Sequence, residues 1–123
     1  MTGPLLLVDA ENVRRSRWPN IGPAELVRLV VAWAEREQID AVVVFDGHAP
    51  GGGSGRVEVV GTRSETADDW IARRAAACAA EGRAHRLATS DRGLRARAGG
   101  AAEAVIGGGK FAAELLRGGT TPE

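Results

Sequence analysis

Three aspartates of this 123-residue chain, Asp9, Asp46 and Asp91, each lie at the end of a short apolar stretch typical of a buried strand. The carboxyl ends of parallel strands meet at the edge of an open sheet where ligands bind. We therefore expect the three carboxylates to gather at one edge. Asp68 joins them if its helix starts at the same edge.

Carboxylates that gather in this way repel one another, and each raises the pKa of its neighbours unless a cation neutralises them. The arrangement therefore predicts a divalent cation. A site made only of oxygen ligands favours Mg²⁺ or Mn²⁺ over zinc or copper. A single aspartate is more often a turn or helix-cap residue, so the argument depends on the recurrence at three strand ends.

Arginines flank these acids in the sequence, although 16 basic and 16 acidic residues leave the whole chain without net charge. An acidic pit with a basic rim suits a phosphodiester substrate, because the rim binds phosphates while the pit holds metal. Each arginine taken alone is more often part of a solvated helix face. The candidate rim residues are Arg14, Arg15, Arg17, Arg63 and Arg92.

Alternating strands and helices must position these residues. The patterning predicts strands over residues 4–8, 41–45, 56–61, 84–89 and 103–106, and helices over residues 23–38, 65–81, 93–98 and 111–117. This order predicts an α/β fold, a three-layer α/β/α sandwich with a mainly parallel five-stranded sheet. A chain of this length makes one domain, expected over residues 1–117, and a polar tail follows over residues 118–123.

The second long helix has clear signals at its start and along its buried face. Ser64 or Thr66 is expected to cap its amino end. Its inner face is expected to consist of Ile71, Ala75, Cys78 and Ala79. The glycine-rich segment 47–55 before the third strand is long enough to allow a parallel neighbour but does not require one.

Composition excludes several classes of protein. The chain is 44% hydrophobic and 26% charged, as globular domains are, and it contains no run of about 20 uncharged residues that could span a membrane. The first residues lack the basic region of a signal peptide, so a cytoplasmic location is expected. Cys78 is the only cysteine, and with His48 and His85 it cannot build a structural zinc site.

Four segments resemble, in order and spacing, the motif blocks of the NYN domain, a PIN-like nuclease superfamily, and specifically its YacP-like branch. They are Val8–Val13, Val44–Gly47, Ser64–Ile71 and Thr89–Asp91. The resemblance implies a Rossmann-like three-layer fold and a metal-dependent ribonuclease. It also implies that Asp9, Asp46, Asp68 and Asp91 bind the metal, while Asn12 and Ser90 help to place the attacking water or the scissile phosphate. Asp69 competes with Asp68 for the third acidic position.

The sequence departs from this family at one position. Several NYN proteins have a lysine three residues before the third acid, where this chain has Glu65. Whether Arg63 supplies the missing positive charge is left open. Trp18 and Trp70 could stack on bases near the site, although an aromatic residue beside a helix start more often packs against the protein.

These observations together predict an endoribonuclease that uses Mg²⁺ or Mn²⁺ to hydrolyse RNA, expected to be single-stranded. One alternative is an aspartyl-phosphate enzyme or receiver-like domain. It would use strand-end acids and a lysine after the fifth strand, where Lys110 fits, but it has no use for an acid on a helix. The other alternative is a non-catalytic RNA-binding NYN module, and four unneutralised acids would weaken its binding to RNA.

Overall fold

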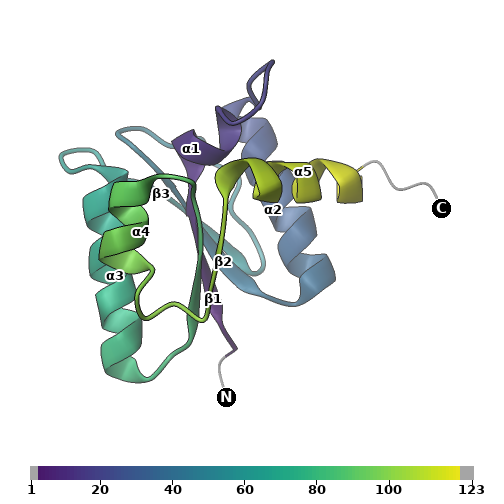
Figure 1. Cartoon of the computed structure of the whole chain (residues 1–123). Coiled ribbons are helices and arrows are strands. Elements are labelled where there is room, and N and C mark those ends of the chain that lie inside the picture. Colours follow the sequence, from purple (N-terminus) through teal and green to yellow (C-terminus); the bar gives the residue numbers. More distant parts are fainter. Residues whose placement is uncertain (1–2, 120–123) are drawn as a thin grey trace.

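The computed structural model describes residues 3–119 and forms three layers around a five-stranded, all-parallel sheet (Figure 1). The strands are β1 (Leu5–Asp9), β2 (Asp40–Phe45), β3 (Val57–Gly61), β4 (His85–Ala88) and β5 (Ala104–Ile106). The helices are α1 (Ala10–Arg14), α2 (Pro23–Glu37), α3 (Ala67–Glu81), α4 (Arg92–Ala98) and α5 (Gly108–Gly119). The predicted α/β/α sandwich is confirmed.

The central strand β1 is apolar up to its terminal Asp9 because both of its faces are covered. All five of its residues are buried. Leu6 and Val8 belong to the core under α1, α2 and α5, whereas Leu5 and Leu7 belong to the core under α3 and α4. Side chains that alternate between two buried faces produce the continuous apolar run seen in the sequence.

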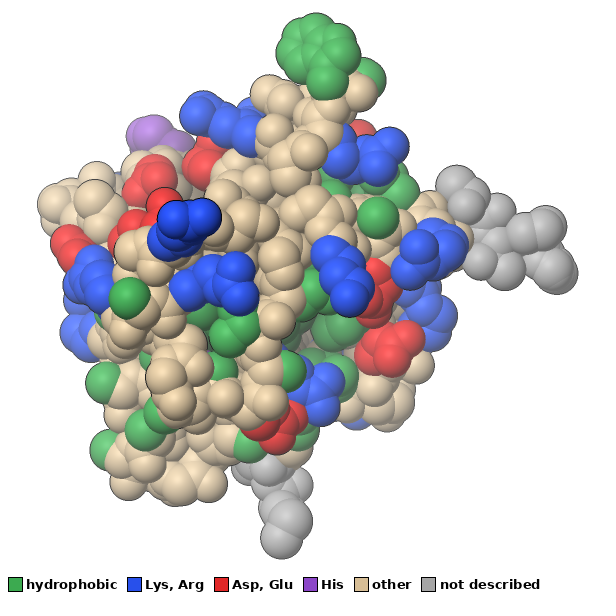
Figure 2. All heavy atoms as spheres, in the orientation of Figure 1, with side chains coloured by type: hydrophobic (Ala, Val, Ile, Leu, Met, Phe, Trp, Pro, Cys, Tyr) green, Lys and Arg blue, Asp and Glu red, His purple; other side chains and the backbone are tan. Residues whose placement is uncertain are grey.

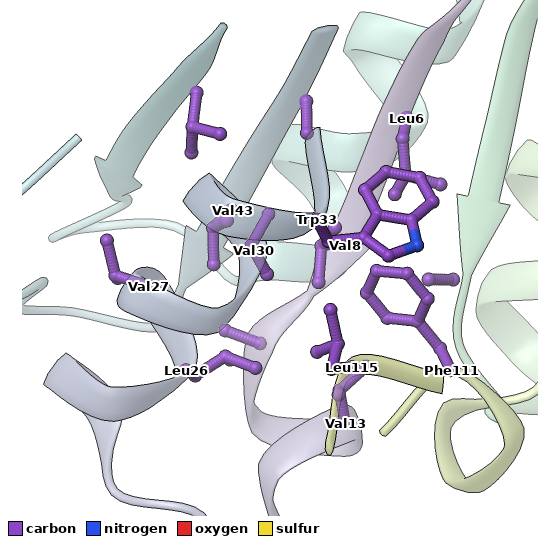
Figure 3. Packing of buried hydrophobic residues seen from close by; sticks show 14 of the residues in the cluster. Leu6, Val8, Val13, Leu26, Val27, Val30, Trp33, Val43, Phe111 and Leu115 are labelled. Carbon is purple, nitrogen blue, oxygen red and sulfur yellow. The ribbon is translucent and has the colours of Figure 1, made fainter. Parts of the chain in front are cut away.

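The core between α2 and α5 is built around an aromatic pair. The rings of Trp33 and Phe111 meet edge to face, with centroids 5.2 Å apart (Figure 3). The indole Nε1 of Trp33 donates a hydrogen bond to Oε2 of Glu114 at 2.7 Å. These contacts hold α5 against α2 and thereby fix the position at which α5 starts.

The strand order β3-β2-β1-β4-β5 reverses direction beside β1. The chain first builds outward from β1 to β2 and β3, and then crosses to the other side of β1 for β4 and β5. Such a reversal opens a crevice beyond the carboxyl ends of the strands, where ligands bind in open α/β sheets. The ends of β1 and β4 both face this crevice.

Several boundaries differ from the predicted ones. The helix α1 was not predicted, because five residues are too few to show a helical period. The helix α5 starts at Gly108 and continues to Gly119, so the start of the predicted tail is helical, while residues 120–123 lie outside the described part. Glycine disfavours a helix by about 1 kcal/mol, and the packing of Phe111 and Leu115 overrides this cost.

Two details of α3 are also settled. Thr66, not Ser64, caps the helix, because its Oγ1 accepts a hydrogen bond from the amide of Asp69 at 3.0 Å. Ala79 is exposed, so its predicted place on the inner face was wrong, whereas the other three inner-face residues are buried. Trp70 packs against the core under α3 and α4.

None of the helices within residues 3–119 is long and apolar enough to cross a membrane.

Candidate active site

A cavity of about 580 Å³ lies at the carboxyl edge of the sheet and collects all six residues predicted to be catalytic. It is lined by Asp9, Glu11, Asn12, Arg15, Ser16, Asp46, Thr66, Asp68, Ser90 and Asp91. The four predicted acids come from four separate segments of the chain. Figure 2 shows acidic side chains gathered at this end of the molecule, with basic side chains near them.

Asp9 is the most deeply placed of the four acids. It is the last residue of β1 and only 6% exposed, and its Oδ2 accepts a hydrogen bond from the hydroxyl of Thr89 at 2.8 Å. The pKa of Asp9 is raised to about 6, mainly by burial; the negative charges of Asp68 and Asp91 contribute to the rise, and hydrogen bonds from Thr89 and from the backbone of Asn12 oppose it. Ionisation of Asp9 is therefore less favourable in this protein than in an exposed aspartate.

Asp46 connects the end of β2 to the start of α3. Its Oδ1 accepts a hydrogen bond from the amide of Ala67, the first residue of α3, at 2.6 Å. This contact brings the first turn of α3 to the sheet edge and with it Asp68, which lines the cavity. Burial raises the pKa of Asp68, and the charges of Asp91 and Asp46 add to this effect.

Asp69 has a different environment from Asp68. Its Oδ1 pairs with Nη2 of Arg97 on α4 at 2.9 Å, and it does not line the cavity. Neighbouring residues on a helix point about 100° apart, so only one of the two acids can face the sheet edge. Asp68 is the one that does.

Asp91 caps α4 and also lines the cavity. Its Oδ1 accepts a hydrogen bond from the amide of Leu94 at 2.8 Å, and its own amide donates to Oγ1 of Thr89 at 3.1 Å. Asp91 is therefore both a helix cap and part of the cavity wall. The cap orients the carboxylate toward the same crevice as Asp9.

Asn12 and Ser90 tie three segments together at the cavity. The amide of Ser90 donates to Oδ1 of Asn12 at 2.8 Å, and the amide of Gly108 donates to Oγ of Ser90 at 2.8 Å. A Cβ atom at position 108 would collide with Oδ1 of Asn12. The absence of a side chain at Gly108 therefore allows α5 to start against this pair.

The predicted arginines are not all at the cavity. Arg15 lines it, 67% exposed, with Nε 3.2 Å from Oε1 of Glu11. Arg14 is only 17% exposed and lies 3.4 Å from the same oxygen. Arg17, Arg63 and Arg92 are exposed and do not line the cavity. Lys110, which the receiver alternative requires near the acids, is also exposed and away from the cavity.

Sequence reasoning missed two residues that shape the site, Thr89 and Glu11. The register pairs Val8 of β1 with Ala88 of β4, so the next residues along these strands, Asp9 and Thr89, come side by side. Knowledge of the strand order would have been needed to see this. Glu11 lines the cavity and pairs with Arg15, and its closeness to Asp9 in the sequence was the available signal.

The carboxylates line the same cavity but do not surround one common ion-binding position. Within residues 3–119, no three side chains of His, Cys, Asp or Glu lie close enough to hold one ion together. Burial is the main cause of the raised pKa of Asp9 and of Asp68, and the charges of the neighbouring acids add to it, so the acids interact.

Comparisons with known proteins agree with this fold. The family described as YacP-like NYN domain matches residues 9–117. The crystal structure of Rae1 (YacP) from Bacillus subtilis aligns with a TM-score of 0.73 at 24% identity, over 92% of this chain and 74% of that one. A tryptophan-to-leucine mutant of the same protein gives a TM-score of 0.72 at 25% identity, over 93% and 76% of the two chains. A search of curated proteins finds no significant match.

Proposed function

Because the chain belongs to the YacP-like NYN domain family, we propose that it is an endoribonuclease that hydrolyses single-stranded RNA with the help of Mg²⁺ or Mn²⁺. The observation that carries the proposal is the cavity at the sheet edge, to which four separate segments contribute Asp9, Asp46, Asp68 and Asp91. Within the described part of the chain, no histidine lines this cavity, and a group of carboxylate oxygens could instead hold a metal ion that activates water for hydrolysis of a phosphodiester bond.

The donors of the cavity suit a hard divalent cation. All four acids offer carboxylate oxygens, and a cation would offset both the burial and the mutual repulsion that raise the pKa of Asp9 and of Asp68. Mg²⁺ retains several water ligands and binds one or two protein carboxylates, so acids that do not form a closed cage still fit it. When bound, such an ion would activate water for attack and stabilise the leaving oxygen.

The protein itself orients the acids. Asp9 accepts a hydrogen bond from Thr89 and Asp46 accepts one from the amide of Ala67, while Asp91 accepts one from Leu94 of the helix that it caps, all at 2.6 to 2.8 Å. Side chains held in this way do not have to be ordered when substrate binds. Arg15 lies on the cavity wall, where its guanidinium is placed to bind a phosphate of the RNA backbone.

Cleavage of a labelled single-stranded RNA oligonucleotide tests this proposal. The wild-type protein should cut it with Mn²⁺ or Mg²⁺ and should stop when EDTA is added. Asp68→Asn should lower the cleavage rate by at least about 100-fold, because even the loss of a residue that only supports a ligand costs 10- to 100-fold. Asp69→Asn is the matched control, since it changes the adjacent acid, which lies outside the cavity, and it should retain cleavage.

Three outcomes would contradict the proposal. Equal losses in Asp68→Asn and Asp69→Asn would show that the acids have been assigned wrongly. Tight RNA binding without cleavage would identify a non-catalytic module. Transfer of a phosphoryl group from acetyl phosphate to Asp9 or Asp46, blocked by Lys110→Ala, would identify a receiver-like domain.

A further inference from the structure

Trp18 is the one large hydrophobic side chain within residues 3–119 that is highly exposed, at 88%. It belongs to the loop 15–22 between α1 and α2, which projects beyond α1 at the carboxyl edge of the sheet (Figure 1). Figure 2 shows hydrophobic side chains that stand clear of the surface at this end of the molecule. The other two tryptophans differ, since Trp33 is buried and Trp70 packs against the core.

The loop that carries Trp18 is anchored at both ends. At its start, the hydroxyl of Ser16 donates to the carbonyl oxygen of Val13 at 2.6 Å. At its end, the amide of Ile21 donates to the carbonyl oxygen of Arg14 at 3.0 Å, and the Ile21 side chain is buried. The exposed residues 17–20 are therefore held between two fixed points, and the indole is displayed by an ordered segment.

The anchored start of the loop is also a wall of the candidate active site. Arg15 and Ser16 both line the cavity. Trp18 follows Ser16 by two residues, which span at most about 7 Å of chain. The backbone of Trp18 therefore lies within about 7 Å of a residue of the cavity wall.

The residue between them adds positive charge. Arg17 is exposed, and it has no ion-pair partner in the part of the chain that the structure describes. Sites for single-stranded nucleic acids combine basic groups that follow the backbone with aromatic rings on which bases stack. Arg17 and Trp18, which directly follow the cavity-lining Ser16, supply one group of each kind.

We propose that Trp18 forms a base-stacking subsite, in which its indole packs on an unpaired base of the RNA while Arg17 contacts an adjacent phosphate. This inference rests on the proposed ribonuclease function and extends it by naming the part of the substrate that is recognised. Every base has a flat aromatic face, so the subsite requires an unpaired base but does not select its identity. A fully paired duplex keeps its bases stacked inside and cannot use it.

Binding of labelled RNA by fluorescence anisotropy in EDTA, where no cleavage occurs, tests the subsite. Trp18→Ala should weaken binding to a single-stranded oligonucleotide by about tenfold, which corresponds to the loss of one base–aromatic stack. Trp18→Phe keeps a ring and should restore most of the affinity. Neither change should alter the melting temperature, because the side chain is almost fully exposed in the described fold.

Three further measurements separate stacking from a general loss of affinity. Oligonucleotides with a single abasic position, moved along the strand, should include one for which Trp18→Ala has no additional effect, because the stacked base is already missing. Tryptophan fluorescence should fall when RNA binds the wild type and the control Trp70→Phe, and it should not fall in Trp18→Phe. Binding to duplex RNA should be equal for the wild type and Trp18→Ala.

The results distinguish failure of the subsite from failure of the ribonuclease function. If the wild type cuts single-stranded RNA and Trp18→Ala binds it as tightly, the subsite is refuted and the function stands. If the wild type neither binds nor cuts RNA, both are refuted. A change of oligomeric state in Trp18→Ala with unchanged RNA affinity would assign the indole to a protein contact and would also overturn the inference.

Discussion

Replacing Asp9 by asparagine is expected to stabilise the metal-free protein at pH 8. Asp9 is 6% exposed, and burial, with the charges of Asp68 and Asp91, raises its pKa from 3.8 to about 6. In the unfolded chain the carboxyl group has its ordinary pKa, so the ionised form is less favourable in the fold than in the unfolded state. The difference corresponds to about 3 kcal/mol of unfolding free energy, a loss that the uncharged variant Asp9→Asn avoids.

The sign of this effect depends on pH in a defined way. A carboxyl group with a raised pKa binds its proton more tightly in the folded state, so the wild type loses stability as the pH rises from about 4 to about 6. The advantage of Asp9→Asn should therefore be absent below pH 4, grow between pH 4 and 6, and stay constant above. The amide oxygen of asparagine can still accept the hydrogen bond from Thr89.

Urea unfolding followed by circular dichroism, in EDTA at pH 3.5, 5 and 8, measures this difference. Asp69→Asn is the control, because it removes an acid that is about half exposed and paired with Arg97. Loss of such a surface ion pair costs at most about 1 kcal/mol. The reasoning is refuted if Asp9→Asn, with a native spectrum, is no more stable than the wild type at pH 8, or if its advantage is the same at all three pH values.

Further predictions concern packing, metal and core. Gly108→Ala should displace the Asn12 side chain and lower RNA cleavage by about 10- to 100-fold, whereas Gly109→Ala, whose Cβ would lie at an ordinary 3.8 Å from its nearest neighbour, should leave cleavage unchanged. Mn²⁺ at 100 times its Kd should raise the unfolding free energy by about 2.7 kcal/mol, and calorimetry should show a smaller rise for Asp91→Asn. Leu7→Ala, at a fully buried position, should cost about 2 to 5 kcal/mol in urea unfolding.

Much of the fold could be predicted because the central strands are buried on both faces. The apolar runs that end at Asp9 and near Asp46 indicate both the strand and the edge at which its acid lies. The parallel order of the strands then places these ends together. The short helix α1 and the glycine-rich start of α5 could not be predicted, because tertiary packing and not local preference determines them.

The acidic residues of the candidate site could be predicted from the sequence, whereas the residues that hold these acids in place could not. Asp68 and Asp69 are adjacent, and the choice between them depends on the direction from which α3 approaches the sheet, which the hydrogen bond between Asp46 and Ala67 sets. Thr89 supports Asp9 only because β1 and β4 are neighbours. Contacts between segments far apart in the chain carry this information, and no local pattern contains it.

The acids differ in their effect on the stability of the fold, and this difference helps to interpret the sequences of divergent relatives. Asp46 and Asp91 hold the first turns of α3 and α4, so selection for folding alone would retain them in a relative without the proposed ribonuclease activity. Asp9 lowers the stability of the metal-free fold, and selection for folding alone would favour its replacement by asparagine. Under the proposed function, the residue at position 9 is therefore the more informative marker of activity, and an asparagine there beside intact acids at 46 and 91 would indicate a relative that does not cleave RNA.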